Sequence, residues 1–264
     1  MRAMISAVVL TKNAERTIKF CLRSLAFANE RIVIDDRSSD KTVALAKRLG
    51  AHVYERGLAG DFAAARNFGL QKASQEWVLF VDADEQVSQK LAGEIQQKLA
   101  SVPTQVRGFY LKRRDTFLGR RLDHGETAAV RLLRLARRGS GQWQGEVHEV
   151  WKVKGRVENL DAPLDHDRNL NLSQFMTRLA VYAQIKAQER YRKHKQESLF
   201  RVFLNPLSKF IQNYFWRLGF LDGFPGLVMA WFMSWHSLLV RIWLRLLWRN
   251  HGKDTFVPNP KLWQ

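Results

Sequence analysis

The chain has 264 residues, 46% of them hydrophobic, which is enough for one large domain or for one domain with a sizeable appendage. Its single cysteine excludes an internal disulfide. The net charge of +18 is uneven: residues 1–100 hold 15 basic and 12 acidic residues, residues 101–156 hold 13 and 5, and residues 185–264 hold 13 and 4. The positive charge beyond residue 100 predicts an anionic partner, namely phosphates, anionic lipid or nucleic acid.

The first hundred residues alternate between strand-like and helix-like segments. The predicted strands are 5–10, 31–36, 51–55 and 76–84, and the predicted helices are 14–27, 42–50, 61–73 and 88–100. This alternation is typical of parallel βαβ units, and the strands lack polar alternation, as strands buried on both faces do. The predicted fold class is therefore α/β, with an open, mostly parallel sheet flanked by helices.

Polar residues follow three of these strands. Thr11-Lys12-Asn13 follows the first strand, Asp35-Asp36 ends the second, and the acids of Asp82-Ala83-Asp84 end the fourth. Ligands of open parallel sheets bind at the carboxyl ends of the strands, so we expect the three clusters to converge on one edge. Two aspartates at this spacing can hold Mg²⁺ or Mn²⁺ together with substrate phosphates, although a solvated turn is the alternative.

Residues 104–160 are less regular. The stretches GFYLKRR and VWKVKGRV predict strands, and between them lie the basic stretch RRLDHGETAAVRLLRLARR and the segment GQWQGEVHE. Residues 172–196 then predict a helix, because Phe175, Leu179, Tyr182 and Ile185 recur on one side.

The C-terminal part is rich in tryptophan. Residues 199–248 hold five of the nine tryptophans, and the run from Gly223 to Val240 is uncharged over 18 residues. This run is just short of the ~20 residues that a membrane-spanning helix needs. Arg241, Arg245 and Arg249 follow on one helix face. We predict a helix that lies in or re-enters the membrane interface; a spanning helix and a core or oligomer helix are the alternatives.

Taken together, the motifs resemble the GT-A fold of family 2 inverting glycosyltransferases. The matching stretches in the first hundred residues are TKNAE, DDRSSDKT, ARNFG and VDADE. Further along, FLGRRLDHG, VRLLR, WQGEVHE, the DH at 165–166 and RLGFLDGFPG resemble the subgroup that contains the lipopolysaccharide-core β1,4-glucosyltransferase. This chain has His124-Gly125-Glu126-Thr127 where the subgroup has HGGW-like residues. No G-x-G-x-x-G follows the first strand, which argues against a dinucleotide-binding Rossmann domain.

The resemblance implies roles for individual residues. Those expected to hold the nucleotide of a UDP-sugar donor are Thr11, Asn13, Glu15, Asp35, Asp36, Arg66 and Asp82. Those expected to hold Mg²⁺ or Mn²⁺ are Asp84, Asp82, Gln86 and His166, with a place beside a helix cap as the alternative for Gln86. The general base, which takes the proton of the acceptor hydroxyl, is Glu149, with Glu146 as the alternative. Those expected to meet the acceptor are His124, Arg131, Arg134 and His148.

The resemblance also implies a domain organisation and a reaction. Residues 1–170 are expected to form the catalytic GT-A domain, in which residues 1–100 bind the nucleotide sugar and residues 101–170 supply the acceptor site and the base. Residues 171–264 are expected to form a helical, basic, Trp-rich extension that associates with membrane. The implied reaction transfers a hexose, glucose from UDP-glucose, to a lipopolysaccharide-core or other lipid-linked glycan.

The implied location is the cytoplasm, with the protein peripheral on the inner face of the bacterial inner membrane. Three alternatives remain at this point: a transferase that uses a polyprenyl-phosphate acceptor, a basic nucleic-acid-binding protein, and a nucleotide-sugar-binding module without catalysis. Nucleic acid is not the expected partner, because the acid clusters lie in the nearly neutral first hundred residues. The oligomeric state does not follow from the sequence.

Overall fold

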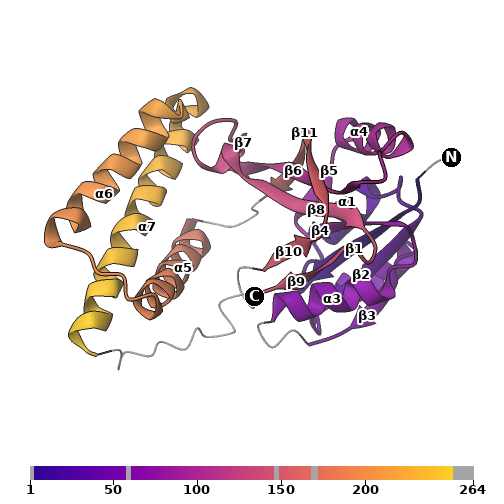
Figure 1. Ribbon diagram of the computed structural model, residues 1–264, viewed down its shortest axis with the longest axis horizontal. Coiled ribbons are helices and arrows are strands. Elements are labelled where there is room, and N and C mark those ends of the chain that lie inside the picture. The colour runs from indigo at the N-terminus through magenta and orange to yellow at the C-terminus, as the bar shows by residue number, and fades with distance from the viewer. Residues whose placement is uncertain (1–2, 58–60, 146–148, 168–171, 252–264) are drawn as a thin grey trace. The chain divides into compact units, whose positions relative to one another are not determined.

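The computed structural model describes residues 3–57, 61–145, 149–167 and 172–251 (Figure 1). The chain forms two compact units. The first, here called the sheet unit, consists of Met1–Asp115 and Val130–Asp167. The second, here called the helical unit, consists of Thr116–Ala129 and Arg168–Gln264. The first of the three points at which the chain passes from one unit to the other, between Asp115 and Thr116, falls within the long strand β6, Val106–Phe117. The functional division expected at residue 170 stays a prediction.

The sheet unit is built on a mixed sheet. Its strands are β1 Ile5–Thr11, β2 Glu30–Asp35, β3 His52–Glu55, β4 Trp77–Asp82, β5 Glu85–Val87, β6 Val106–Phe117, β8 Arg131–Arg137 and β11 Arg156–Asp167. Their order across the sheet is β3-β2-β1-β4-β8-β6-β11-β5, and the short β7 Arg120–Arg121 pairs with the end of β6. The four strands from β3 to β4 are parallel, whereas β8 is antiparallel to both β4 and β6. The predicted α/β class is confirmed, and the parallel part belongs to the first hundred residues.

Helices cover both faces of this sheet. They are α1 Ile18–Ser24, α2 Thr42–Arg48, α3 Phe62–Lys72 and α4 Gln89–Ala100. Successive side chains of a strand point to opposite faces, so β1 serves two cores. Ile5, Ala7 and Val9 pack in the core that contains residues of α1, α2 and α4, whereas Val8 and Leu10 pack in the core that contains residues of α3. The central parallel strands β1, β2 and β4 are therefore largely buried on both sides, as their apolar sequences predict, whereas β3 at the edge of the sheet is partly exposed.

The ARNFG stretch of α3 fastens that helix to two neighbours. A Cβ added at Gly69 would lie 2.5 Å from Cγ1 of Val8, so only glycine allows this approach of α3 to β1. Asn67 contacts a separate hairpin, formed by β9 Gly141–Gln144 and β10 Val150–Val153. Its side-chain amide donates to the carbonyl of Trp143 and accepts from the N–H of Trp143, both at 2.9 Å. The hairpin is thereby anchored to α3.

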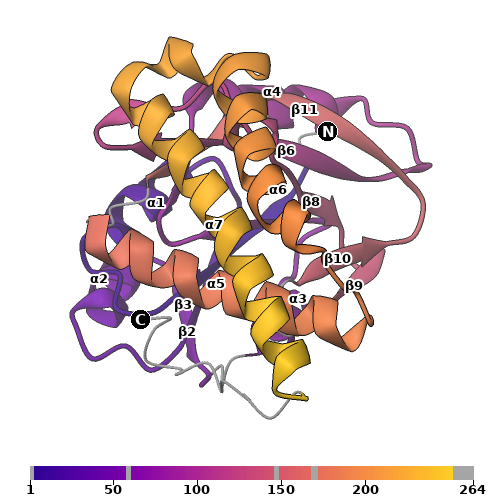
Figure 2. The same cartoon turned by 90° about the vertical axis from the view of Figure 1, so that its left-hand side faces the viewer.

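The helical unit holds three long helices and a segment from earlier in the chain. The helices are α5 Leu172–Arg192, α6 Leu199–Ile211 and α7 Gly223–Arg249, and a π-helical turn, Gln212–Trp216, and a 3-10 turn, Gly219–Asp222, join α6 to α7. Figure 2 shows α6 and α7 side by side and α5 crossing α7. Phe117 packs with Phe175 and Phe232, and Asp222 accepts from the backbone N–H of His124. These contacts attach residues 116–129 to the helices.

The stretch Gly219–Arg249 is, within the described residues, the one helix long and apolar enough to cross a membrane. Its most apolar 18-residue window has a mean hydropathy of 1.4, and 33% of that window is buried inside the structure. Length and composition alone satisfy this test, which the core helix of a soluble protein can also pass. The predicted apolar C-terminal helix is therefore present, and its place in or on a membrane stays a prediction.

Candidate active site at the strand ends

Three strand ends with polar side chains lie next to one another at the carboxyl edge of the parallel strands. Thr11 of β1 pairs in register with Asp35 of β2, and Leu10 of β1 pairs with Asp82 of β4. The structure thus brings the polar ends of these strands to one edge, where ligands of such sheets bind.

Hydrogen bonds join the loop after β1 to the loop after β2. The side-chain oxygen of Asn13 accepts from the N–H of Ser39 at 2.9 Å, and Asn13 has a φ of 46°, a left-handed conformation that asparagine tolerates better than most residues. Asp35 is fully buried and accepts from the N–H and the hydroxyl of Ser38 at 2.8 and 2.6 Å. Both side chains therefore shape the loops of this edge.

Of the other residues predicted for the nucleotide, Glu15 and Asp36 lie in the same two loops and Thr11 ends β1, whereas Arg66 lies on α3 and Asp82 ends β4. The ammonium of Lys12 pairs with Asp36 at 2.9 Å, and the Glu15 carboxylate accepts from the N–H of Lys41 at 3.3 Å. Thr11 is buried, and its hydroxyl has no hydrogen-bond partner among the residues that the structure describes. A buried hydroxyl without a partner is costly unless water or a ligand satisfies it.

Asp82 lies between two buried guanidinium groups. Arg66 donates to one carboxylate oxygen at 2.8 Å and Arg134 to the other at 2.6 Å, and these arginine side chains are only 3% and 7% exposed. Burial by itself would raise the pKa of Asp82, but the charges of Arg134 and Arg66 outweigh it and hold that pKa well below its usual range. Asp82 is therefore ionised at every physiological pH.

Arg66 also bonds the predicted base. Its Nε donates to Glu149 at 2.9 Å, and its guanidinium lies over the ring of Trp143, 4.7 Å from the centroid. Two donor edges of one rigid guanidinium thus hold Asp82 of the sheet and Glu149 beside the hairpin in a common geometry. Nη1 of Arg66 and both Nε and Nη1 of Arg134 are buried without a hydrogen-bond partner among the described residues. These buried donors favour an anionic ligand at this place.

Asp84 and His166 form a second cluster. The two imidazole nitrogens of His166 lie 3.3 Å from the Asp84 carboxylate and 2.8 Å from that of the fully buried Asp115. Burial lowers the pKa of His166, but the hydrogen bonds and charges of the neighbouring acids prevail and raise that pKa to about 9. His166 is therefore protonated at neutral pH, and Asp84, whose side chain is 43% exposed, remains open to a ligand.

The donor atoms at this edge fit a hard divalent cation that is shared with phosphates. Within the described ranges, no group of three or more His, Cys, Asp or Glu side chains is placed to hold a metal ion by itself. Mg²⁺ commonly binds through one or two carboxylates plus substrate phosphate oxygens, and the exposed Asp84 offers such a carboxylate. Gln86 alternates with the buried Glu85 and Val87 along β5, so its side chain leaves the strand on the other face.

The residues predicted to meet an acceptor have separate surroundings. Arg131 donates to the carbonyl of Leu160 at 2.9 Å, whereas Arg134 belongs to the Asp82 cluster. His124 lies in the helical unit, where its ring pairs with Asp222 at 2.8 Å. Glu146 and His148 lie outside the described residues.

Two buried acids that orient histidines were not singled out from the sequence. Asp115 holds His166, and Asp222 holds His124. For Asp115 a signal existed: it is a lone acid directly after the basic run Lys112-Arg113-Arg114. An acid that is buried beside so many bases needs a specific partner.

The chain is similar in sequence to a known family and to several known proteins. A family model described as glycosyl transferase family 2 matches residues 6–150. The lipopolysaccharide core biosynthesis glycosyltransferase LpsC of Rhizobium meliloti (strain 1021) is 29% identical over 244 residues, which cover 86% of this chain and 88% of LpsC. An uncharacterized glycosyltransferase of Rickettsia typhi (strain ATCC VR-144 / Wilmington) is 25% identical over 236 residues, which cover 85% of this chain and 80% of that protein.

Among solved structures, the crystal structure of S. aureus TarS 1-349 matches with a TM-score of 0.50 at 15% identity, and the match covers 97% of this chain and 94% of that chain. This likeness shows the fold alone.

Proposed function

The chain belongs to glycosyl transferase family 2, as its motifs predict, and from that premise we propose that it moves glucose from UDP-glucose to a lipopolysaccharide-core or other lipid-linked glycan. The similarity to LpsC, which is named for lipopolysaccharide core biosynthesis, supports this acceptor class. The observation that carries the proposal is the Arg66 bridge, which holds Asp82 and Glu149 together at the carboxyl edge of the sheet.

The proposed division of labour follows the chain. Residues 1–100 bind the nucleotide sugar, residues 101–170 supply the acceptor site and the base, and residues 171–264 associate with the inner face of the bacterial inner membrane. Most of the nucleotide contacts come from the loops after β1 and β2. The unsatisfied hydroxyl of Thr11, at the end of β1, and the Nη1 of Arg66, on α3, are further donors for oxygens of the UDP group.

Asp84 is the proposed ligand for Mg²⁺ or Mn²⁺. Both carboxylate oxygens of Asp82 already accept from arginines, which favours the more exposed Asp84 for this role. When bound, such a cation supplies positive charge that stabilises the departing diphosphate. His166 holds Asp84 in place from the protein side, and Asp115 fixes the imidazole in turn.

Glu149 is the proposed general base. It accepts the proton of the acceptor hydroxyl while the hydroxyl oxygen forms a bond to the anomeric carbon and the bond from that carbon to the diphosphate oxygen breaks on the opposite side. Attack from the opposite side inverts the configuration. Arg66 orients the Glu149 carboxylate, and the Asn67–Trp143 hydrogen bonds hold the hairpin in place.

The test is transfer of labelled glucose from UDP-glucose to two acceptors offered separately: truncated lipopolysaccharide core and polyprenyl phosphate. Calorimetry of UDP-sugars with and without Mn²⁺ measures the donor step alone. We expect transfer to the core acceptor and a loss of about 10²-fold or more in Asp84→Ala, because the charge on the leaving diphosphate is no longer balanced. Asp161→Ala, in an exposed side chain of β11, is the matched control.

Full activity of Asp84→Ala would reject the metal role. Transfer to polyprenyl phosphate alone would replace the proposed acceptor with the alternative one.

A further inference from the structure

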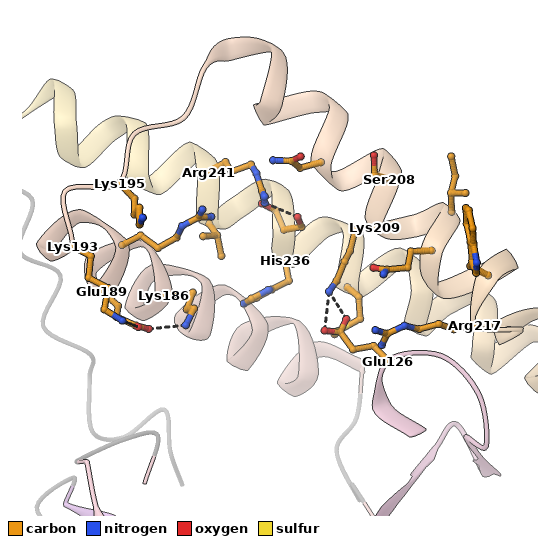
Figure 3. A pocket seen from close by; sticks show the side chains of 18 residues that line it. Glu126, Lys186, Glu189, Lys193, Lys195, Ser208, Lys209, Arg217, His236 and Arg241 are labelled. Carbon is orange, nitrogen blue, oxygen red and sulfur yellow. Dashed lines mark hydrogen bonds and ion pairs between the residues drawn. The ribbon is translucent and has the colours of Figure 1, made fainter. Parts of the chain in front are cut away.

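The helical unit contains a groove for which the transfer reaction has no use. It is a cavity of about 1090 Å³ lined by α5, α6, α7, the turn Gln212–Trp216 and Glu126. Figure 3 shows the arrangement: His236 and Arg241 come from α7, Lys186 comes from α5 and Lys209 comes from α6. A cavity of this size accommodates a small molecule or a lipid head group.

The groove carries a large excess of positive charge. Seven of its 18 lining residues are lysine or arginine, and two are glutamate. Glu189 pairs with Lys186 and Lys193 at 2.7 and 2.6 Å, and Glu126 pairs with Lys209 at 2.7 Å. Each acid of the lining is thus already engaged, and two of the seven basic groups share a single carboxylate.

The other basic groups of the groove have few acidic partners. Arg190 pairs with Glu197 at 2.6 Å, and Arg241 lies 4.0 Å from the same carboxylate. Lys195 and Arg217 form no ion pair with any residue that the structure describes. Unpaired cations in a concave site concentrate anions there.

Helix α6 presents three faces at helical spacing. Val202 and Pro206 are buried. The second face lines the groove with Asn205, Ser208 and Lys209. The third face is apolar yet exposed, and it consists of Phe200, Phe203, Leu204, Leu207 and Ile211. By helical geometry the exposed apolar face lies directly beside the groove-lining face.

The apolar exposure continues beyond α6. Trp216, in the turn after α6, lines the groove and is 84% exposed, and Trp231 and Trp235 of α7 are also exposed. Aromatic and aliphatic side chains beside basic ones are the pattern of surfaces that enter the lipid interface. So large an exposed apolar area is less favourable in water than in a lipid interface.

We propose that this groove binds the phosphorylated head group of an anionic membrane lipid while the exposed apolar face of α6 enters the adjoining lipid interface. Lysine and arginine donors suit the oxygens of a phosphate group, and the apolar face suits the acyl region. With a lipid head group in the groove, α6, which packs beside the tryptophan-rich α7, contacts the membrane. This binding needs no donor and no acceptor sugar, so it can be measured apart from transfer.

His236 lies in the groove and responds to charge within it. Burial lowers the pKa of His236, and the charges of Lys209, Lys186 and Arg241 lower it further against the opposing charge of Glu126. A phosphate group beside the imidazole adds negative charge and raises that pKa. The NMR titration of His236, with and without a short-chain phosphatidylglycerol, therefore reports occupancy of the groove itself.

The decisive experiment is co-sedimentation of the full chain with phosphatidylcholine vesicles, with and without phosphatidylglycerol. We expect binding only when the anionic lipid is present. Lys195→Gln combined with Arg217→Gln should weaken it about 25-fold, since each basic group near an anionic surface contributes on the order of a fivefold change in affinity. Lys47→Gln combined with Arg48→Gln, on exposed residues of α2, removes the same charge outside the groove and should cost less than about twofold.

A second variant tests the apolar contact without changing charge. Phe200→Ser combined with Phe203→Ser keeps every basic group and should also weaken vesicle binding about tenfold, because two exposed aromatic side chains lose their burial in lipid. Equal losses in the groove and α2 variants would show diffuse surface attraction and overturn the proposal. Glycerol phosphate that competes as well as lipid would do the same, since it would identify a soluble ligand.

Discussion

At the strand ends of the sheet unit, Arg66 and Arg134 are buried and each bonds a carboxylate, whereas in the groove of the helical unit Lys195 and Arg217 have no ion pair with any described residue. Burying a charge without a partner is too costly, so the buried arginines come with acids, and the pairs fix one geometry. Exposed cations avoid that cost and stay available to a ligand. Basic side chains thus hold carboxylates in place in the sheet unit and attract anionic ligands in the groove.

The largest effect expected from this contrast is at Glu149. Glu149→Gln keeps a side-chain oxygen that accepts from Arg66 but removes the base, so kcat should fall about 10³-fold with little change in KM. Steady-state transfer of labelled glucose measures both constants. Glu146→Gln should keep kcat within a few-fold, and the reverse result would move the base to Glu146.

The next effect is on stability at Asp82. Asp82→Asn leaves two buried guanidinium groups without their shared carboxylate, so the free energy of unfolding should fall by about 3–5 kcal/mol in urea denaturation. Asp165→Asn is the matched control, because its partner Arg114 is 22% exposed, whereas Arg66 and Arg134 are 3% and 7% exposed. That variant should lose less than about 1 kcal/mol. Similar losses for the two variants would erase the distinction between buried and exposed pairs.

A smaller effect depends on pH and involves His166. Its pKa is raised from 6.5 to about 9 on folding, so its stabilising contribution is fully present below pH 6.5 and is lost as the pH rises through 9. The free energy of unfolding should exceed that of His166→Gln by roughly 2–3 kcal/mol below pH 6.5 and by little above pH 9. Urea denaturation in chelator measures it. Asp115→Asn should remove most of this difference in the free energy of unfolding. A difference that increases as the pH rises would contradict the predicted direction.

The smallest effect is expected in the groove. Lys209→Met breaks the ion pair with Glu126, but both side chains are partly exposed, so the free energy of unfolding should change by less than about 1 kcal/mol. Thermal or urea unfolding at low and high salt checks this value. A loss as large as that of Asp82→Asn would make the groove a structural ion cluster like the strand-end one.

The regular half of the fold was readable in the sequence because its central strands are buried on both faces. The segment 31–36 is an uninterrupted apolar run that ends in acid, and the strand found there is β2, Glu30–Asp35. The antiparallel half was less readable, since β8, which was not predicted as a strand, carries Arg131, Arg134 and Arg137 within its span Arg131–Arg137. Those side chains interrupt the apolar pattern, and the segments 116–129 and 168–264 come together only by packing, as Phe117 does with Phe232.

By itself, the sequence determined the family, the parallel strands and the strand ends that bear acids, because these follow from local apolar runs and motifs. Only the tertiary structure decided which acids meet which bases. Arg66 reaches Asp82 across 16 positions of the chain and Glu149 across 83. A guanidinium can bond any of the 25 acidic residues, and nothing local distinguishes them. The choice follows from distances that exist only after the sheet, α3 and the β9–β10 hairpin have packed.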